Sequence, residues 1–215
     1  AKNYDKLWDF YIVPSYSKTL ARVDLQKGSK ILDLGCGTGA LLKILEDRFP
    51  SSELTGIDLT EEMLAVAKQK LSDNVELLLG SATSLPFDSK SFDWVIMSNV
   101  IGHLSDKKTA LKETHRVLKN PGKIVITDWT RDFQTMNLVH FCTKLINYSQ
   151  YRSLRTAELE SLLDDCDFNH LHTERYKINW FWGLYTIQAE KRKFNQWKAV
   201  QEVLTDPSLI LRLWL

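Results

Sequence analysis

Cysteine is scarce in this chain of 215 residues, and the three that occur, Cys36, Cys142 and Cys166, are widely spaced. An odd number without a CxxC pair excludes a disulfide framework and the usual cysteine pattern of a zinc site. The five histidines form no HxxxH or HExxH motif, so we expect no metal site. Unpaired thiols are typical of a reducing compartment, and we therefore expect a cytoplasmic protein.

An excess of charge of one sign is also lacking. Lys and Arg number 28 and Asp and Glu 27, which leaves a formal net charge of +1. Proteins that bind nucleic acid present a basic surface, so we expect no nucleic-acid partner. No apolar run approaches the roughly 18 residues of a membrane-spanning helix. With 44% hydrophobic and 26% charged residues, the composition is that of one globular domain.

The sequence instead contains a regular alternation of strands and helices. Short apolar segments predict the strands, and apolar residues at helical spacing predict the helices between them. Such an alternation needs right-handed crossovers, which give a largely parallel sheet covered by helices on both faces. Asn120-Pro121-Gly122 predicts a turn before the fifth strand. The predicted strands are 30–34, 53–58, 75–79, 92–98 and 123–128, and the helices are 39–48, 60–71 and 106–118.

The alternation ends after the fifth strand. Residues 131–150 and 156–165 predict helices, and 169–178 and 181–190 predict two adjacent strands, added as an antiparallel edge. We therefore predict an α/β fold, a Rossmann-like three-layer sandwich with a mostly parallel seven-stranded sheet and an antiparallel last hairpin. The chain 1–215 is predicted to be a single domain with a helical N-terminal lid (1–22), a helical substrate-lid insertion (129–165) and a C-terminal helical tail (193–215).

The strongest functional signal is the segment Asp33-Leu34-Gly35-Cys36-Gly37-Thr38-Gly39, between the first predicted strand and helix. Ligands of open α/β sheets bind at the carboxyl ends of the strands, where glycines let the backbone approach them closely. The spacing Gly35-x-Gly37-x-x-Ala40 also fits a dinucleotide loop. However, a carboxylate at Asp33 would repel a diphosphate and attract a cation. The loop therefore favours S-adenosylmethionine, with its ammonium and sulfonium groups, over a nicotinamide dinucleotide.

Five motifs in order resemble those of the class I S-adenosylmethionine-dependent methyltransferases. The resemblance is to the small-molecule branch that contains the ubiquinone- and menaquinone-biosynthesis C-methyltransferases. It covers residues 30–128, nearly half of the chain, and it implies the fold predicted above, S-adenosylmethionine as cofactor and a small-molecule methyl acceptor. The motifs are ILDLGCGTG (31–39), LTGIDLTEEML (54–64), LLLGSATSLPF (77–87), SFDWVIMSNVIGHL (91–104) and RVLKNPGKIVITD (116–128).

Asp58 ends the second predicted strand, where an acidic side chain can accept both ribose hydroxyls of an adenosyl group. The alternative is a capping box, since Asp58 and Glu61 have that spacing. Thr60 is a natural N-cap for the same helix and would leave Asp58 free. Leu59 and Met63 would then flank the adenine, although ordinary core packing is an equally good interpretation of both.

The resemblance places further residues around the donor. Ser81 stands where the family usually has an acidic residue that accepts from the adenine amino group, and Ala82 could donate its amide. Asn99 would line the methionine part, and the aromatic N-terminus with Tyr11 would close over the cofactor or pack on the sheet edge. The predicted cofactor-binding residues are Tyr11, Asp33, Gly35, Cys36, Gly37, Gly39, Asp58, Leu59, Met63, Ser81, Ala82 and Asn99.

A base is needed only if the acceptor must lose a proton, as a phenol would. His103, Asp128 and His140 are the candidate catalytic residues. Alternatives to a methyltransferase are a cofactor-binding protein without catalysis and an NAD(P)-dependent reductase, which Asp33 and the missing Tyr-x-x-x-Lys pair disfavour. A nucleic-acid methyltransferase is disfavoured by the charge balance. The apolar tail at 209–215 predicts a weak membrane contact, a dimer contact or docking on the protein's own surface.

Overall fold

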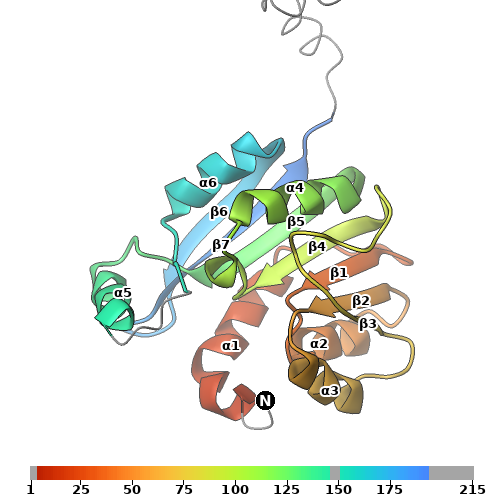
Figure 1. The fold of residues 1–215 in the computed structure, drawn as a ribbon, viewed down its shortest axis with the longest axis horizontal. Coiled ribbons are helices and arrows are strands. Elements are labelled where there is room, and N and C mark those ends of the chain that lie inside the picture. The colour runs from red at the N-terminus through yellow and green to blue at the C-terminus, as the bar shows by residue number, and fades with distance from the viewer. Residues whose placement is uncertain (1–3, 146–150, 194–215) are drawn as a thin grey trace, which may run out of the picture.

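The computed structural model describes residues 4–145 and 151–193 (Figure 1). The C-terminal tail prediction, for 193–215, falls almost wholly outside the described residues. Strands and helices alternate as the sequence predicts. Their bounds are α1 (Tyr4–Leu20), β1 (Lys30–Leu34), α2 (Ala40–Arg48), β2 (Glu53–Asp58), α3 (Glu61–Lys70), β3 (Glu76–Leu79), β4 (Phe92–Ser98), the 3-10 helix η1 (Ile101–His103), α4 (Lys107–Val117), β5 (Leu118–Trp129), α5 (Gln134–Leu145), α6 (Thr156–Asp165), β6 (Phe168–Lys177) and β7 (Gly183–Lys191).

The seven strands form one sheet in the order β3-β2-β1-β4-β5-β7-β6. β1 to β5 run parallel to one another, and β7 runs antiparallel to both β5 and β6. The predicted α/β class, the parallel sheet and the antiparallel last hairpin are confirmed. The strand order reverses between β1 and β4, which is the position where sheets of this kind bind their ligands.

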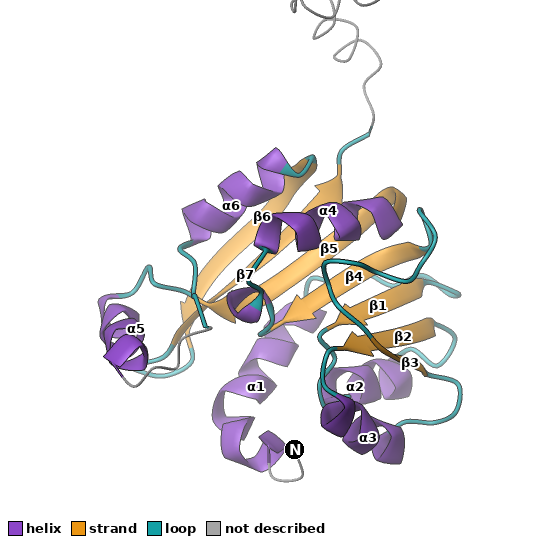
Figure 2. Ribbon diagram, in the orientation of Figure 1, coloured by secondary structure: helices purple, strands orange, loops and turns teal. Residues whose placement is uncertain are grey.

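Helices cover both faces of the sheet (Figure 2), and each face has its own apolar cluster. In β1, Leu32 and Leu34 pack toward α4 and α6, whereas Ile31 packs toward α2 and α3; all three are at most 1% exposed. Burial on both faces explains why these strands are apolar at nearly every position rather than at alternate ones. Truncating one such side chain to alanine typically costs about 2–5 kcal/mol of stability.

The fifth strand differs from its predicted bounds. β5 begins at Leu118 rather than at residue 123, so the segment Asn120–Gly122, predicted as a turn, lies within the strand. Pairing with β4 shifts register there, since Phe92 pairs with Leu118 and Trp94 with Lys123. Proline and glycine do interrupt the ladder, but the chain resumes the same strand after the irregularity.

Helix α1 is fixed to the sheet by side chains of its last turns. Thr19 donates to the hydroxyl of Thr127 at 2.7 Å, and Thr127 lies 2.9 Å from the hydroxyl of Thr186 on β7. Lys18 and Arg22 both pair with Glu174 on β6. These contacts place α1 across β4, β5 and β7, beside the carboxyl edge of the sheet (Figure 1).

Residues 4–145 and 151–193 include no helix that is long and apolar enough to cross a membrane. The same ranges contain no cluster of three or more histidine, cysteine or acidic side chains that could hold a metal ion.

Candidate functional site

The glycine loop after β1 has the backbone conformation that glycine alone adopts without strain. Gly35 and Gly37 have φ angles of 77° and 54°. A Cβ on Gly35 would lie 2.5 Å from Cγ2 of Val100, so this glycine permits the loop after β4 to pack closely. A Cβ on Gly37 would meet nothing within 4 Å. Gly37 therefore faces open space, as a loop that receives a ligand requires.

Asp58, at the end of β2, holds this loop in place. One carboxylate oxygen accepts from the amide of Gly37 at 2.8 Å, and the other accepts from the amide of Thr60 at 2.9 Å. The N-cap of α3 is Thr60, so the capping-box alternative for Asp58 is wrong. A carboxylate offers about four lone-pair sites, of which these two bonds use one on each oxygen. Asp58 can therefore still accept hydrogen bonds from a ligand.

Asp33 is the second carboxylate at this corner of the sheet, and it is only 2% exposed. Burial and the charge of Asp58 raise its pKa to about 7. A cation bound nearby would favour the ionised form of Asp33, which burial and the charge of Asp58 disfavour. The loop residue Cys36 is buried, and its pKa is raised well above the usual value by burial, so this thiol is not reactive.

The predicted adenine contacts lie beside Asp58 in the next two loops. Leu59 is 76% exposed, so ordinary core packing does not explain this residue. Met63 is half-buried on the first turns of α3. The hydroxyl of Ser81 accepts from the amide of Thr83 at 3.2 Å and lies 2.8 Å from its hydroxyl, and Ala82 packs against the core. The Ser81 hydroxyl thus also shapes its own turn.

Asn99 follows β4 and faces α1. It has a φ of 59°, and its amide donates to the carbonyl of Thr127 at 2.7 Å. The side-chain nitrogen donates to the hydroxyl of Ser15 on α1 at 3.1 Å. The side-chain oxygen is shielded from solvent and has no hydrogen-bond partner among the described residues. An unpaired acceptor of this kind points to a group that the structure does not contain.

Aromatic side chains gather where α1 meets the ends of β5 and β7. We call Phe10, Tyr11, Trp129, Tyr151 and Trp182 the aromatic box. Trp129 lies 5.4 Å from Tyr11, 4.9 Å from Tyr151 and 4.8 Å from Trp182 between ring centroids, and Phe10 lies 5.5 Å from Trp182. The indole nitrogens of Trp129 and Trp182 are shielded and lack a partner in the described part of the chain. Sequence reasoning missed Trp182, and only the abundance of aromatics near it gave a signal.

Two of the three candidate catalytic residues come together. Asp128 is the last but one residue of β5, is 1% exposed, and accepts from the amides of Gly102 and Trp129 at 2.9 and 2.8 Å. Burial raises its pKa, and these hydrogen bonds oppose that effect. His103 has an exposed side chain, and partial desolvation lowers the pKa of its ring while Asp128 raises it. His140 belongs to α5, but its side chain lies outside the described ones.

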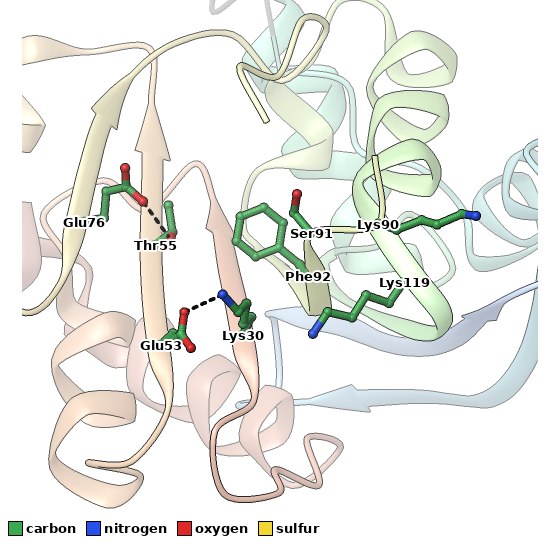
Figure 3. A pocket seen from close by; sticks show the side chains of 8 residues that line it. All are labelled: Lys30, Glu53, Thr55, Glu76, Lys90, Ser91, Phe92 and Lys119. Carbon is green, nitrogen blue, oxygen red and sulfur yellow. Dashed lines mark hydrogen bonds and ion pairs between the residues drawn. The ribbon is translucent and has the colours of Figure 1, made fainter. Parts of the chain in front are cut away.

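A distinct pocket lies at the opposite edge of the sheet (Figure 3), at the amino ends of β1 to β4. Its volume is about 380 Å³. Lys30 pairs with Glu53 at 2.7 Å, and Thr55 donates to Glu76 at 3.4 Å. None of the predicted site residues lines this pocket. Its polar groups largely satisfy one another, so we place the functional site at the carboxyl edge.

Comparisons with known proteins find methyltransferases. Residues 32–126 match the family described as "Methyltransferase domain". The demethylmenaquinone methyltransferase of Staphylococcus epidermidis is 42% identical over 109 residues, which cover 49% of this chain and 45% of that protein. The enzyme of the same name from Thermotoga maritima is 29% identical over 196 residues, which cover 83% and 85% of the two chains.

Solved structures support the same fold. An S-adenosylmethionine-dependent methyltransferase from Thermotoga maritima superposes with a TM-score of 0.74 at 19% identity and covers 89% of this chain and 94% of its own. The chain spans about half the length of the Staphylococcus relative that it matches. Residues 32–126 thus match a methyltransferase domain, and the chain is similar to the demethylmenaquinone methyltransferases in sequence and to solved methyltransferases in fold.

Proposed function

We propose that this protein transfers a methyl group from S-adenosylmethionine to a small-molecule acceptor. The main support for this proposal is that Asp33 and Asp58 lie beside Gly37, whose backbone faces open space. The donor supplies an activated methyl carbon on a sulfonium. The acceptor's lone pair forms the new bond to that carbon while the carbon–sulfur bond breaks, and the electron pair stays on sulfur in the product S-adenosylhomocysteine.

The residues around the glycine loop fit this donor one by one. Asp33 would take the ammonium group, and Asp58 would accept the ribose hydroxyls with its remaining lone pairs. The exposed face of Leu59 and the half-buried Met63 would flank the adenine, whose edge would meet Ser81 and the amide of Ala82. The backbone of Gly35, Cys36, Gly37 and Gly39 would line the methionine end, together with Asn99.

The protein's main task in this reaction is alignment. Holding nucleophile, methyl carbon and sulfur in line can lower the barrier by about 7–11 kcal/mol, because the entropy of encounter is lost on binding. Helix α1 and the aromatic box stand over the carboxyl edge, where they would exclude water from the site. Tyr11, which is 4% exposed, and helix α5, which belongs to the predicted substrate lid, would also exclude water from the site.

The acceptor that fits best is a planar ring bearing an oxygen. The names of the relatives suggest a demethylmenaquinone-like ring. The rings of the aromatic box suit stacking on such an acceptor, and the unpaired indole nitrogens of Trp129 and Trp182 could donate to its oxygen. The lowered pKa of His103 favours the neutral imidazole, which could take the proton of a ring hydroxyl. His140 remains a second candidate base.

A cofactor-binding protein without catalysis is the second candidate function, since the same site would serve it. We place the protein in the reducing cytoplasm, on the evidence of its free buried thiols Cys36 and Cys166. Contact of the tail with a membrane or a second copy is retained as a proposal from its apolar sequence alone.

Isothermal titration with S-adenosylhomocysteine and with NAD separates the first proposal from the reductase. We expect the former to bind and the latter not to. Binding of NAD alone would overturn the donor assignment. Transfer of a labelled methyl group to a short-chain demethylmenaquinone that has first been reduced to its quinol, whose ring carries hydroxyl groups, distinguishes an enzyme from a binding protein.

A further inference from the structure

Tyr151 connects two of the candidate catalytic groups. Its hydroxyl donates to Asp128 at 2.7 Å, and the side chain is 8% exposed. The ring lies against the imidazole of His103, with centroids 4.8 Å apart, and against the indole of Trp129 at 4.9 Å. The phenol therefore joins a buried carboxylate to the exposed histidine at the edge of the site.

Gly102 permits this close approach. A Cβ on Gly102 would lie 2.3 Å from Cε2 of Tyr151. The amide of Gly102 donates to the second oxygen of Asp128 at 2.9 Å, and its carbonyl accepts from the amide of Arg152 at 2.7 Å. Hydrogen bonds to two other segments, β5 and the segment that contains Tyr151 and Arg152, thus hold η1, the turn that carries His103.

We propose that Tyr151 is a positioning residue for His103: anchored on Asp128, its phenol ring holds the imidazole at the mouth of the site. This inference rests on the proposed function, because it concerns the base of the transfer reaction. Asp128 is 1% exposed and accepts three hydrogen bonds, so it does not face the acceptor. His103 is exposed, and Asp128 and Tyr151 act through it.

The arrangement has an electrostatic consequence that a merely structural contact would lack. The charged groups that act on His103 are Asp128, which raises the pKa of the imidazole, and Lys107, which lowers it. The hydrogen bond from Tyr151 lowers the pKa of Asp128 and so favours the ionised carboxylate. Removing the hydroxyl should raise the pKa of Asp128 further, so that this carboxylate is neutral over more of the pH range and the pKa of His103 should fall.

The test is a histidine NMR titration of the full chain carrying Tyr151→Phe. We expect the pKa of His103, assigned with His103→Gln, to fall by about 0.5 or more, because the nearby negative charge weakens. The matched control is Tyr176→Phe, which removes another hydroxyl, 3.1 Å from that of Thr186 on the neighbouring strand. It should leave His103 unchanged. An identical titration of His103 in Tyr151→Phe and the wild type overturns the proposal.

A second variant covers the case in which Tyr151→Phe does not fold. Gly102→Ala keeps the phenol in the chain but displaces its ring, so the ring-proton resonances of His103 should move from their wild-type positions. Coincident resonances in a folded variant contradict the positioning role. Titration of the same proteins with S-adenosylhomocysteine tests the proposed function separately, since the His103 signals report on Tyr151 even if no donor binds.

Discussion

The two edges of the sheet use charge in opposite ways. At the carboxyl edge, the buried Asp33 lies near Asp58, and the pKa of Asp33 is raised to about 7. At the amino edge, Glu53 pairs with Lys30 at 2.7 Å, and Asp93 pairs with Lys119 at 2.8 Å. Glu53 and Asp93 at the amino edge thus pair with lysines of this chain, whereas Asp33 and Asp58 at the carboxyl edge are suited to a cation from outside. In this protein, a carboxylate that has no cationic partner among the described residues marks the proposed binding site.

The largest expected effect separates two glycines that share a backbone state. Gly37 and Gly28 have φ angles of 54° and 78°, and a Cβ on either meets nothing within 4 Å, but Gly28 lies near the amino edge. Gly37→Val should weaken S-adenosylhomocysteine by roughly 100-fold or more, about 2.7 kcal/mol, because its side chain fills the donor's space. Gly28→Val carries comparable strain and should bind normally. Equal affinities in calorimetry would show that the loop is not the site.

Next come two carboxylates that each accept from a backbone amide. Asp58 accepts from Gly37, and Asp93 accepts from Lys30 at 2.9 Å. We expect Asp58→Ala to weaken S-adenosylhomocysteine about tenfold or more, since the ribose loses its acceptor. Asp93→Ala should lower thermal stability but preserve affinity. A similar loss of affinity in both variants would trace the effect to stability rather than to the ribose.

A smaller effect is the pH dependence of donor affinity. A cation favours ionised Asp33, whose pKa in the free protein is about 7. Binding therefore releases a proton, and affinity should rise several-fold from pH 6 to pH 8. Calorimetry in buffers of different ionisation enthalpy measures the proton released. An affinity that does not change with pH, in the wild type or in Asp33→Asn, would contradict the role of Asp33 in binding the cation.

The raised pKa of Asp33 also determines how the stability of the ligand-free protein changes with pH. The pKa of Asp33 in the folded state is raised above its ordinary value of 3.8 to about 7, so between these two values the folded protein holds a proton that the unfolded chain releases. This contribution is present below about pH 4 and is lost as pH rises through 7. Relative to Asp33→Asn, the wild type should therefore lose melting temperature over that interval. Melting temperatures of the wild type and Asp33→Asn that change in the same way with pH would contradict the raised pKa of Asp33.

The smallest expected effect belongs to the amino edge. Lys30 and Glu53 form an exposed ion pair, and such pairs contribute little to stability because water and salt screen them. Lys30→Ala should leave both the affinity for S-adenosylhomocysteine and the melting temperature nearly unchanged. A marked loss of affinity would show that the pocket in Figure 3 communicates with the donor site.

Local sequence patterns were sufficient for most of the fold. β1, β2 and β4 have the predicted bounds, because most of their interior positions are buried and carry mainly apolar residues. β5 was predicted too short, since the break at Asn120–Gly122 looks like a turn until its pairing with β4 is known. The catalytic and lid predictions on His140 and residues 146–150 concern positions whose side chains the structure does not describe.

The sequence by itself determined the order of elements, the glycine loop and the acidic residue at the end of each of the first two strands. These features depend on neighbours in the chain, so residue type and spacing reveal them. Only the tertiary structure decided that Asp33 lies buried near Asp58, that Trp129 and Trp182 meet, and that Tyr151 reaches Asp128. Those contacts join segments distant in sequence, and desolvation and hydrogen bonding depend on what the folded chain brings together.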